Sequence, residues 1–187
     1  METNTTPTTC QRYEEADRPL RALLGRLTPE QWSEPSACEG WSARDVVRHL
    51  IETQREFLAG HGLDLGDAPD IDGDPAAAWR SHSEAVVTRI SDDSVTATPF
   101  DGHFGPTTIG ETLAKFYVFD MVVHRWDVAR SVGADVAFDD TELDALEAGI
   151  VSFGDAIYME GICKSGIDAP AGADRQTRVL ATLGRRA

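Results

Sequence analysis

A chain of 187 residues, 41% of them hydrophobic, is long enough to bury a core and falls within the usual size of one domain. Its formal net charge of -15, from 17 Lys and Arg against 32 Asp and Glu, disfavours binding to nucleic acid and to anionic membrane surfaces. Neither a signal peptide nor an apolar stretch of roughly 18 residues is present, so we expect a cytoplasmic protein that does not span a membrane.

The N-terminal part of the chain predicts one helix after a flexible start. Residues 1–8 are polar and rich in Thr, and we expect them to be flexible. Apolar residues then recur at helical spacing from Tyr13 to Leu27. Pro19 should kink this helix or mark its beginning, because proline lacks the amide donor and clashes with the preceding turn.

A second helix is predicted over about residues 42–59. Ser42 can cap its first turn, and Asp45, three residues later, completes a variant of the capping box. The helix has a broad apolar face, and His49 lies on or near the rim of that face.

A third helix is predicted over about residues 74–90, where Asp74 and Pro75 follow a loop rich in Gly and Asp. The stretch near 95–107 mixes β-branched residues with turn residues. It predicts either a short hairpin or an irregular crossover.

The strongest helical pattern begins at the capping box of Thr108 and Glu111 and extends to Gly133. A last helix is predicted over about 141–160, followed by an extended tail that ends in a short turn. Four long helices with one long crossover predict an all-α four-helix bundle, with 9–187 as a single domain that includes a short C-terminal extension.

Two side chains of the strongest helix are suited to hold a metal ion. Asp120 and His124 are four residues apart and therefore lie on one face of the helix. His49 is the best candidate for a third ligand. Asp120 sits in an apolar stretch where an unpaired carboxylate would be costly, although Arg125 or Lys115 could supply the positive charge instead of a metal.

Other polar and aromatic residues have simpler interpretations. Three widely spaced cysteines without a CxxC pair argue against a disulfide framework and a thiolate zinc site. For Cys38, an inert buried thiol is favoured over a thiolate activated by the dipole of the following helix. Asp127 can accept a hydrogen bond or be an exposed acid. Whether these two residues or His103 reach the metal site is left open. The remaining candidates are expected to be core anchors (Trp41, Trp126) or solvated side chains (His61, His82, His103).

Three segments resemble a known family. They are PSACEGWSARDVVRHL, FYVFDMVVHRWDVARSVGAD and DAPAGADRQTRVLATLGRRA. The chain resembles the DinB-like metal-binding helical bundles, specifically the N-terminal domain type of mycothiol-dependent maleylpyruvate isomerase in its short single-domain members. The resemblance implies that His49, Asp120 and His124 are the metal ligands. The isomerase has Glu where this chain has Asp120, and a separate C-terminal domain contributes to the isomerase active site, so its particular reaction is not carried over.

The resemblance implies a divalent metal ion, with zinc as the first expectation and nickel, manganese or iron as alternatives. It also implies activation of a low-molecular-weight thiol such as mycothiol toward a small electrophile, as in a transferase or isomerase. A metal-dependent hydrolase, with Asp127 or Glu52 as general base, a non-enzymatic metal-binding stress-response module and an Fe(II) oxygenase are the alternatives. The expected partners are a small-molecule substrate or thiol, and a homodimer is left open.

Overall fold

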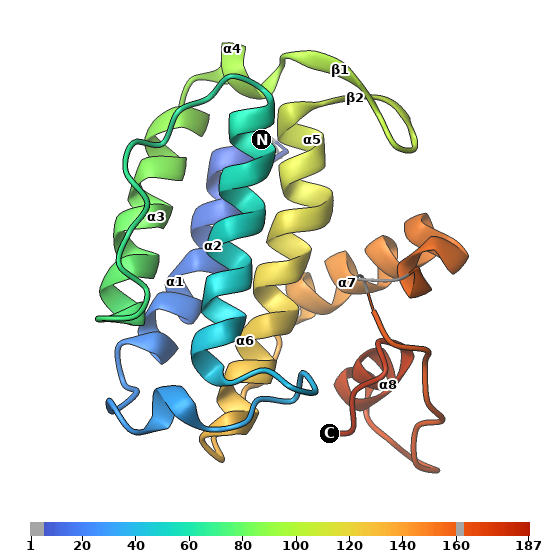
Figure 1. Ribbon diagram of the computed structural model, residues 1–187. Helices are drawn as coiled ribbons and strands as arrows, with labels where there is room; N and C mark the ends of the chain where they lie inside the picture. The colour runs from blue at the N-terminus through green and yellow to red at the C-terminus, as the bar shows by residue number, and fades with distance from the viewer. Residues whose placement is uncertain (1–5, 160–162) are drawn as a thin grey trace, which may run out of the picture. The chain divides into compact units, whose positions relative to one another are not determined.

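The computed structural model describes residues 6–159 and 163–187, and Figure 1 shows their ribbon. The chain divides into two compact units, one that extends to Ala134 and one that begins at Asp135. The domain predicted over 9–187 therefore spans both units. Within the described residues, no helix is both long and apolar enough to cross a membrane.

Helices dominate the first unit. Its longest are α1 (Thr9–Leu24), α2 (Ala43–Gly60), α3 (Pro75–Ile90) and α6 (Phe119–Ser131). Both α1 and α2 pack against α3 and against α6, so the four helices enclose a common core. The following side chains are among those buried in it: Leu20, Val46, Leu50, Trp79, Val86, Met121 and Val123. The mostly helical class predicted from the sequence is confirmed.

Helices α2 and α3 begin at the capping residues that the sequence indicates. Ser42 accepts a hydrogen bond from the backbone N–H of Asp45, whose side chain accepts one from the backbone of Ser42. The Asp74 side chain caps α3 by accepting a hydrogen bond from the backbone N–H of Ala77. Helix α1 begins at Thr9, after the cap residue Thr8, and continues through Pro19, so the proline lies inside this helix and does not mark its beginning. Of the predicted flexible segment 1–8, residues 1–5 lie outside the described residues.

The stretch after α3 contains a short hairpin, as one of the two sequence predictions proposed. A single helical turn, α4 (Asp93–Thr96), precedes the antiparallel strands β1 (Pro99–Gly102) and β2 (Gly105–Thr108). Phe100 pairs with Thr107 in their register.

The single long helix predicted after Thr108 contains a π-helical segment. It starts as α5 (Ile109–Thr112), passes through the π-helical residues Leu113–Val118, named η2, and continues as α6. A π-helical turn accommodates more residues than an α-helical turn and so changes the direction of the side chains that precede it. The periodicity of apolar residues does not reveal this segment, which ends two residues before Asp120.

A buried polar network corrects one prediction from the sequence. His82 was expected to be solvated, but only 1% of its surface is exposed. Its Nε2 lies 2.9 Å from Oε1 of Gln54, which also accepts a 2.8 Å hydrogen bond from the Tyr13 hydroxyl. These residues connect α1, α2 and α3, and burial lowers the pKa of His82 to about 3.

The second unit contains α7 (Asp140–Phe153), the 3₁₀ turn η3 (Gly154–Tyr158) and α8 (Arg175–Thr182). The predicted helix over 141–160 was too long because Gly154, with φ of 52°, ends α7, and residue 160 lies outside the described residues. The predicted extended tail instead contains α8, which Asp174 caps. Arg175 anchors α8 to α7 through carboxylates of Asp144 and Glu147.

Candidate metal centre

Side chains from two helices of the first unit meet at one carboxylate. His49 lies on α2, and Asp120 and His124 lie on α6. The Asp120 Oδ2 atom is 3.0 Å from His49 Nε2, and its Oδ1 atom is 3.2 Å from His124 Nε2. The structure thus brings all three residues nominated from the sequence together. We refer to His49, Asp120 and His124 as the triad.

The triad is partly open to solvent. The exposed fractions of the side chains are 25% for His49 and 32% for Asp120, whereas only 8% of His124 is exposed. A cation held by these three groups would therefore keep room for a further ligand on the side of His49 and Asp120. Open coordination positions distinguish catalytic sites from closed structural ones.

The other edge of the His124 ring faces a second acid. Nδ1 of His124 lies 2.8 Å from Oδ2 of Asp127, whose side chain is fully buried. The Cys38 thiol donates to the same oxygen at 3.3 Å and lies 3.8 Å from Nδ1 of His124. Sequence reasoning favoured an inert Cys38 and left Asp127 undecided. The i,i+3 spacing of His124 and Asp127 was a signal, but nothing in the sequence placed Cys38 beside them.

The charges of the site depend on one another. Burial acts to raise the pKa of Asp120, but the imidazoles of His124 and His49 outweigh it and hold this pKa below its usual value. For His124, burial acts to lower the pKa, but Asp120, then Asp127 and Cys38, raise it well above the usual value. The neighbouring acids therefore favour the protonated form of His124 when no cation is bound. A bound cation would replace its Nε2 proton.

A tight turn places Trp41 beside the triad. The backbone N–H of Trp41 donates to the Cys38 carbonyl at 3.0 Å, and Gly40 between them has φ of 80°. The Trp41 ring lies 5.0 Å from the His49 ring and 6.3 Å from the His124 ring. With 37% of its surface exposed, Trp41 is not the core anchor that the sequence predicted. It covers one side of the two imidazoles, while Trp126 is buried as expected.

The chemistry of the triad fits a divalent cation. Among the described residues, two groups have ligand atoms close enough to share an ion, namely the triad and the set of Cys38, His124 and Asp127. Two imidazole nitrogens and a carboxylate are ligands that zinc and several transition metals accept. His103 belongs to neither group and lies exposed in the hairpin turn, while His61 packs against the ring of Phe100.

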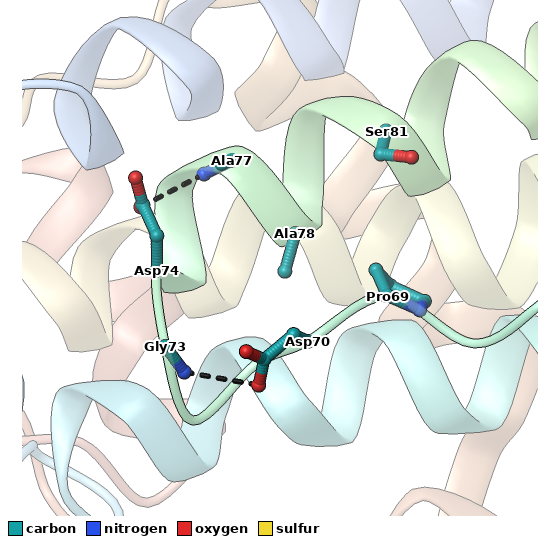
Figure 2. Close-up of a pocket in the computed structure, with 7 residues that line it drawn as sticks. All are labelled: Pro69, Asp70, Gly73, Asp74, Ala77, Ala78 and Ser81. Atoms are coloured by element: carbon teal, nitrogen blue, oxygen red, sulfur yellow. Dashed lines mark hydrogen bonds between the residues drawn. The ribbon is translucent and has the colours of Figure 1, made fainter.

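A cavity of about 410 Å³ lies elsewhere, at the beginning of α3. Figure 2 shows its lining residues, among which Asp70 and Asp74 are the acidic ones. Both carboxylates accept backbone hydrogen bonds at 3.0 Å, Asp70 from Gly73 and Asp74 from Ala77. These acids therefore stabilise the local turn and the helix start, and the cavity offers no comparable set of reactive groups.

Comparison with known proteins supports the resemblance seen in the sequence. Residues 13–129 match the model of a family described as the mycothiol maleylpyruvate isomerase N-terminal domain. Searches of curated proteins and of solved structures gave no match. The matched range includes the triad, Cys38 and Asp127 and spans more than half of the chain. The chain belongs to this family, which suggests a metal-binding domain related to mycothiol chemistry.

Proposed function

We propose that this member of the mycothiol maleylpyruvate isomerase N-terminal domain family binds one divalent metal ion and activates a low-molecular-weight thiol toward a small electrophile. The observation that carries the proposal is the convergence of His49 Nε2, Asp120 and His124 Nε2 from α2 and α6, with the imidazole rings of the two histidines 5.1 Å apart. The family match supports mycothiol as the thiol.

The residues of the site would have different roles in binding the ion and the substrate. A divalent ion, when bound, stabilises a thiol as its thiolate and so provides a nucleophile at neutral pH. The triad would hold the ion, and the exposure of His49 and Asp120 leaves space for the thiol. Trp41 offers a partly exposed aromatic surface next to that space. Such a surface suits contact with the apolar part of a small substrate.

We assign the first unit to the DinB-like four-helix bundle, with α1, α2, α3 and α6 as its helices. The packing of α1 and α2 against both α3 and α6 supports this assignment. Bundles of this type build their metal sites from side chains on facing helices, and the triad comes from α2 and α6. Zinc is the first candidate ion, and nickel, manganese and iron accept the same nitrogen and oxygen ligands.

Metal analysis of the purified protein tests the binding step. Wild type should hold one divalent ion per chain, whereas His49→Ala, Asp120→Ala and His124→Ala should each bind zinc far more weakly in a competitive titration. His103→Ala removes an exposed histidine outside the triad and is the matched control. Stoichiometric metal in all three triad variants would refute the site.

A turnover assay tests the reaction. Zinc-loaded protein is mixed with mycothiol and a chromogenic electrophile, and the thiol-dependent rate is compared with that of His124→Ala and of metal-stripped protein. A hydrolase would instead turn over an ester without a thiol. Its candidate general bases are poorly suited, because Asp127 is fully buried and bonded to His124, and Glu52 is exposed and outside both donor groups. Tight metal binding with neither activity would favour the non-enzymatic module.

A further inference from the structure

We infer that Asp127 and Cys38 are positioning residues of the proposed metal centre. Asp127 holds the His124 ring so that Nε2 faces the ion, and the Cys38 thiol holds Asp127. The inference rests on the proposed metal site and extends it to two residues that do not bind the ion themselves.

The two edges of the His124 ring face different groups. Nε2 lies 3.2 Å from Oδ1 of Asp120, on the side of the triad, and Nδ1 lies 2.8 Å from Oδ2 of Asp127. A neutral imidazole carries its proton on one nitrogen and a lone pair on the other. Asp127 is a carboxylate and accepts the Nδ1 proton, which leaves the lone pair of Nε2 for the cation. A metal-ligating histidine commonly depends on such an acceptor at its second nitrogen.

The thiol of Cys38 completes the arrangement. None of the Asp127 side chain is exposed to water. A buried carboxylate needs hydrogen-bond donors, because burial without them costs free energy. Oδ2 of Asp127 receives Nδ1–H of His124 at 2.8 Å and S–H of Cys38 at 3.3 Å. Two donors at one oxygen fix its position, and the ring of His124 is held with it.

The turn that carries Cys38 is itself fixed to the first turn of α2. Pro35 and Ser42 form an isolated antiparallel bridge, and the Ser36 hydroxyl accepts a hydrogen bond from the Cys38 backbone N–H at 3.1 Å. Ser42 is the cap residue of α2, the helix that carries His49. The same turn therefore caps the helix that carries His49 and positions the Cys38 thiol. Through Asp127, this thiol helps to hold His124 on α6.

Direct binding of an ion by Cys38, His124 and Asp127 is the competing arrangement. It would require Nδ1 of His124 to lose its proton and a cation to enter beside a carboxylate with no exposed surface. It would also exclude the exposed ligands His49 and Asp120 from the ion. The geometry therefore favours the triad as the ligand set, with Cys38 and Asp127 holding the His124 ring from its other edge.

Zinc affinity of Asp127→Asn, measured by competition with a chromogenic chelator, is the first test. The Asn side chain keeps the shape of Asp127 but presents a weaker acceptor, so affinity should fall roughly 10–100-fold, the range known for outer partners of metal ligands. The matched control is Asp17→Asn, which changes another buried carboxylate, one that is bonded to Trp79 and belongs to neither group of candidate ligand residues. It should lower stability without changing zinc affinity.

A pair of cysteine variants is the second test and does not depend on how Asp127→Asn folds. Cys38→Ser keeps a donor for Asp127 and should bind zinc nearly as wild type does, whereas Cys38→Ala should bind it about fivefold more weakly, as expected for one lost hydrogen bond. Cys10→Ser is the control, because Cys10 lies on α1 and bonds to Glu14.

Spectroscopy separates positioning from ligation. Cobalt-loaded wild type should show no thiolate-to-metal charge-transfer band, and zinc-loaded protein should show a slowly exchanging Nδ1 proton on His124 by nitrogen-detected NMR. Such a band, or unchanged zinc affinity in both Asp127→Asn and Cys38→Ala, would overturn the inference while leaving the triad intact. If wild type binds no metal, the proposed function fails together with the inference.

Discussion

Nε2 of His49 and Oδ2 of Asp120 lie 3.0 Å apart, although 71 positions separate the two residues in the sequence. The carboxylate is shared, because its second oxygen lies 3.2 Å from Nε2 of His124. A single acid thus connects the histidine of α2 to the histidine of α6. We therefore expect the Asp120 carboxylate to determine whether the two imidazoles can bind one cation together.

The Asp120 carboxylate gives the first prediction. Asp120→Asn removes the charge that attracts a cation, so zinc affinity should fall by at least the roughly 10–100-fold that loss of an outer partner causes. Asp120→Glu keeps the charge with a longer side chain and should retain binding but alter the preference among zinc, nickel and manganese. Competitive titration with each metal measures both effects. Equal zinc affinity in Asp120→Asn and wild type would show that the carboxylate is not a ligand.

Trp41 gives a spectroscopic prediction. Its ring lies 5.0 Å from the ring of His49 and is partly exposed, so its fluorescence should respond when a cation binds the triad. A quenching metal such as nickel should decrease the emission of wild type with saturation at one equivalent. Trp41→Phe should lose most of this response and Trp32→Phe should retain it, since Trp32 is buried in the separate 3₁₀ turn Gln31–Ser33.

His82 predicts how stability depends on pH. Burial lowers its pKa to about 3 from the usual 6.5. Between these values the unfolded chain binds a proton at His82 that the folded protein does not. The free energy of unfolding should therefore fall as pH decreases below 6.5, by up to about 1.4 kcal/mol per pH unit from this residue.

Urea denaturation between pH 6.5 and 5, where few carboxylates titrate, measures this slope. His82→Gln keeps a polar group beside Gln54 but cannot be protonated, and it should flatten the slope. His103→Gln is the matched control, because His103 lies in the exposed hairpin turn. A slope that is equally steep in His82→Gln would contradict the assignment.

The backbone conformation of Gly40 should affect both stability and metal binding. Its φ of 80° lies in the left-handed region, and a Cβ atom there would meet nothing within 4 Å, so the effect of a substitution isolates backbone strain. Gly40→Ala should destabilise the protein by about 1–2 kcal/mol and weaken zinc binding, because the turn positions both Cys38 and Trp41. Gly40→Asn should be milder, since Asn tolerates this conformation better. Thermal melts and zinc titration of both variants provide the comparison.

The local structure was largely predictable from the sequence. Ser42 with Asp45 and Thr108 with Glu111 are capping pairs whose partners lie three residues apart, so the starts of α2 and α5 depend on neighbours in the chain. Asp120 and His124 were recognised for the same reason, since helical spacing alone places them on one face. His49 as their third partner was a choice among histidines, which the family resemblance supported.

The side chains that surround these candidate ligands could be identified only from the tertiary structure. The approach of Cys38 to Asp127 crosses 89 positions, and the burial of His82 depends on α1 and α2 packing around it. The same holds for Trp41, which is partly exposed beside the rings of two histidines rather than buried in the core. Spacing along the chain fixes which side chains share a helix face, whereas contacts between helices depend on packing that no short sequence pattern encodes. The sequence therefore nominated the candidate ligands, and the packing of α2, α6 and the turn at Gly40 decided what surrounds them.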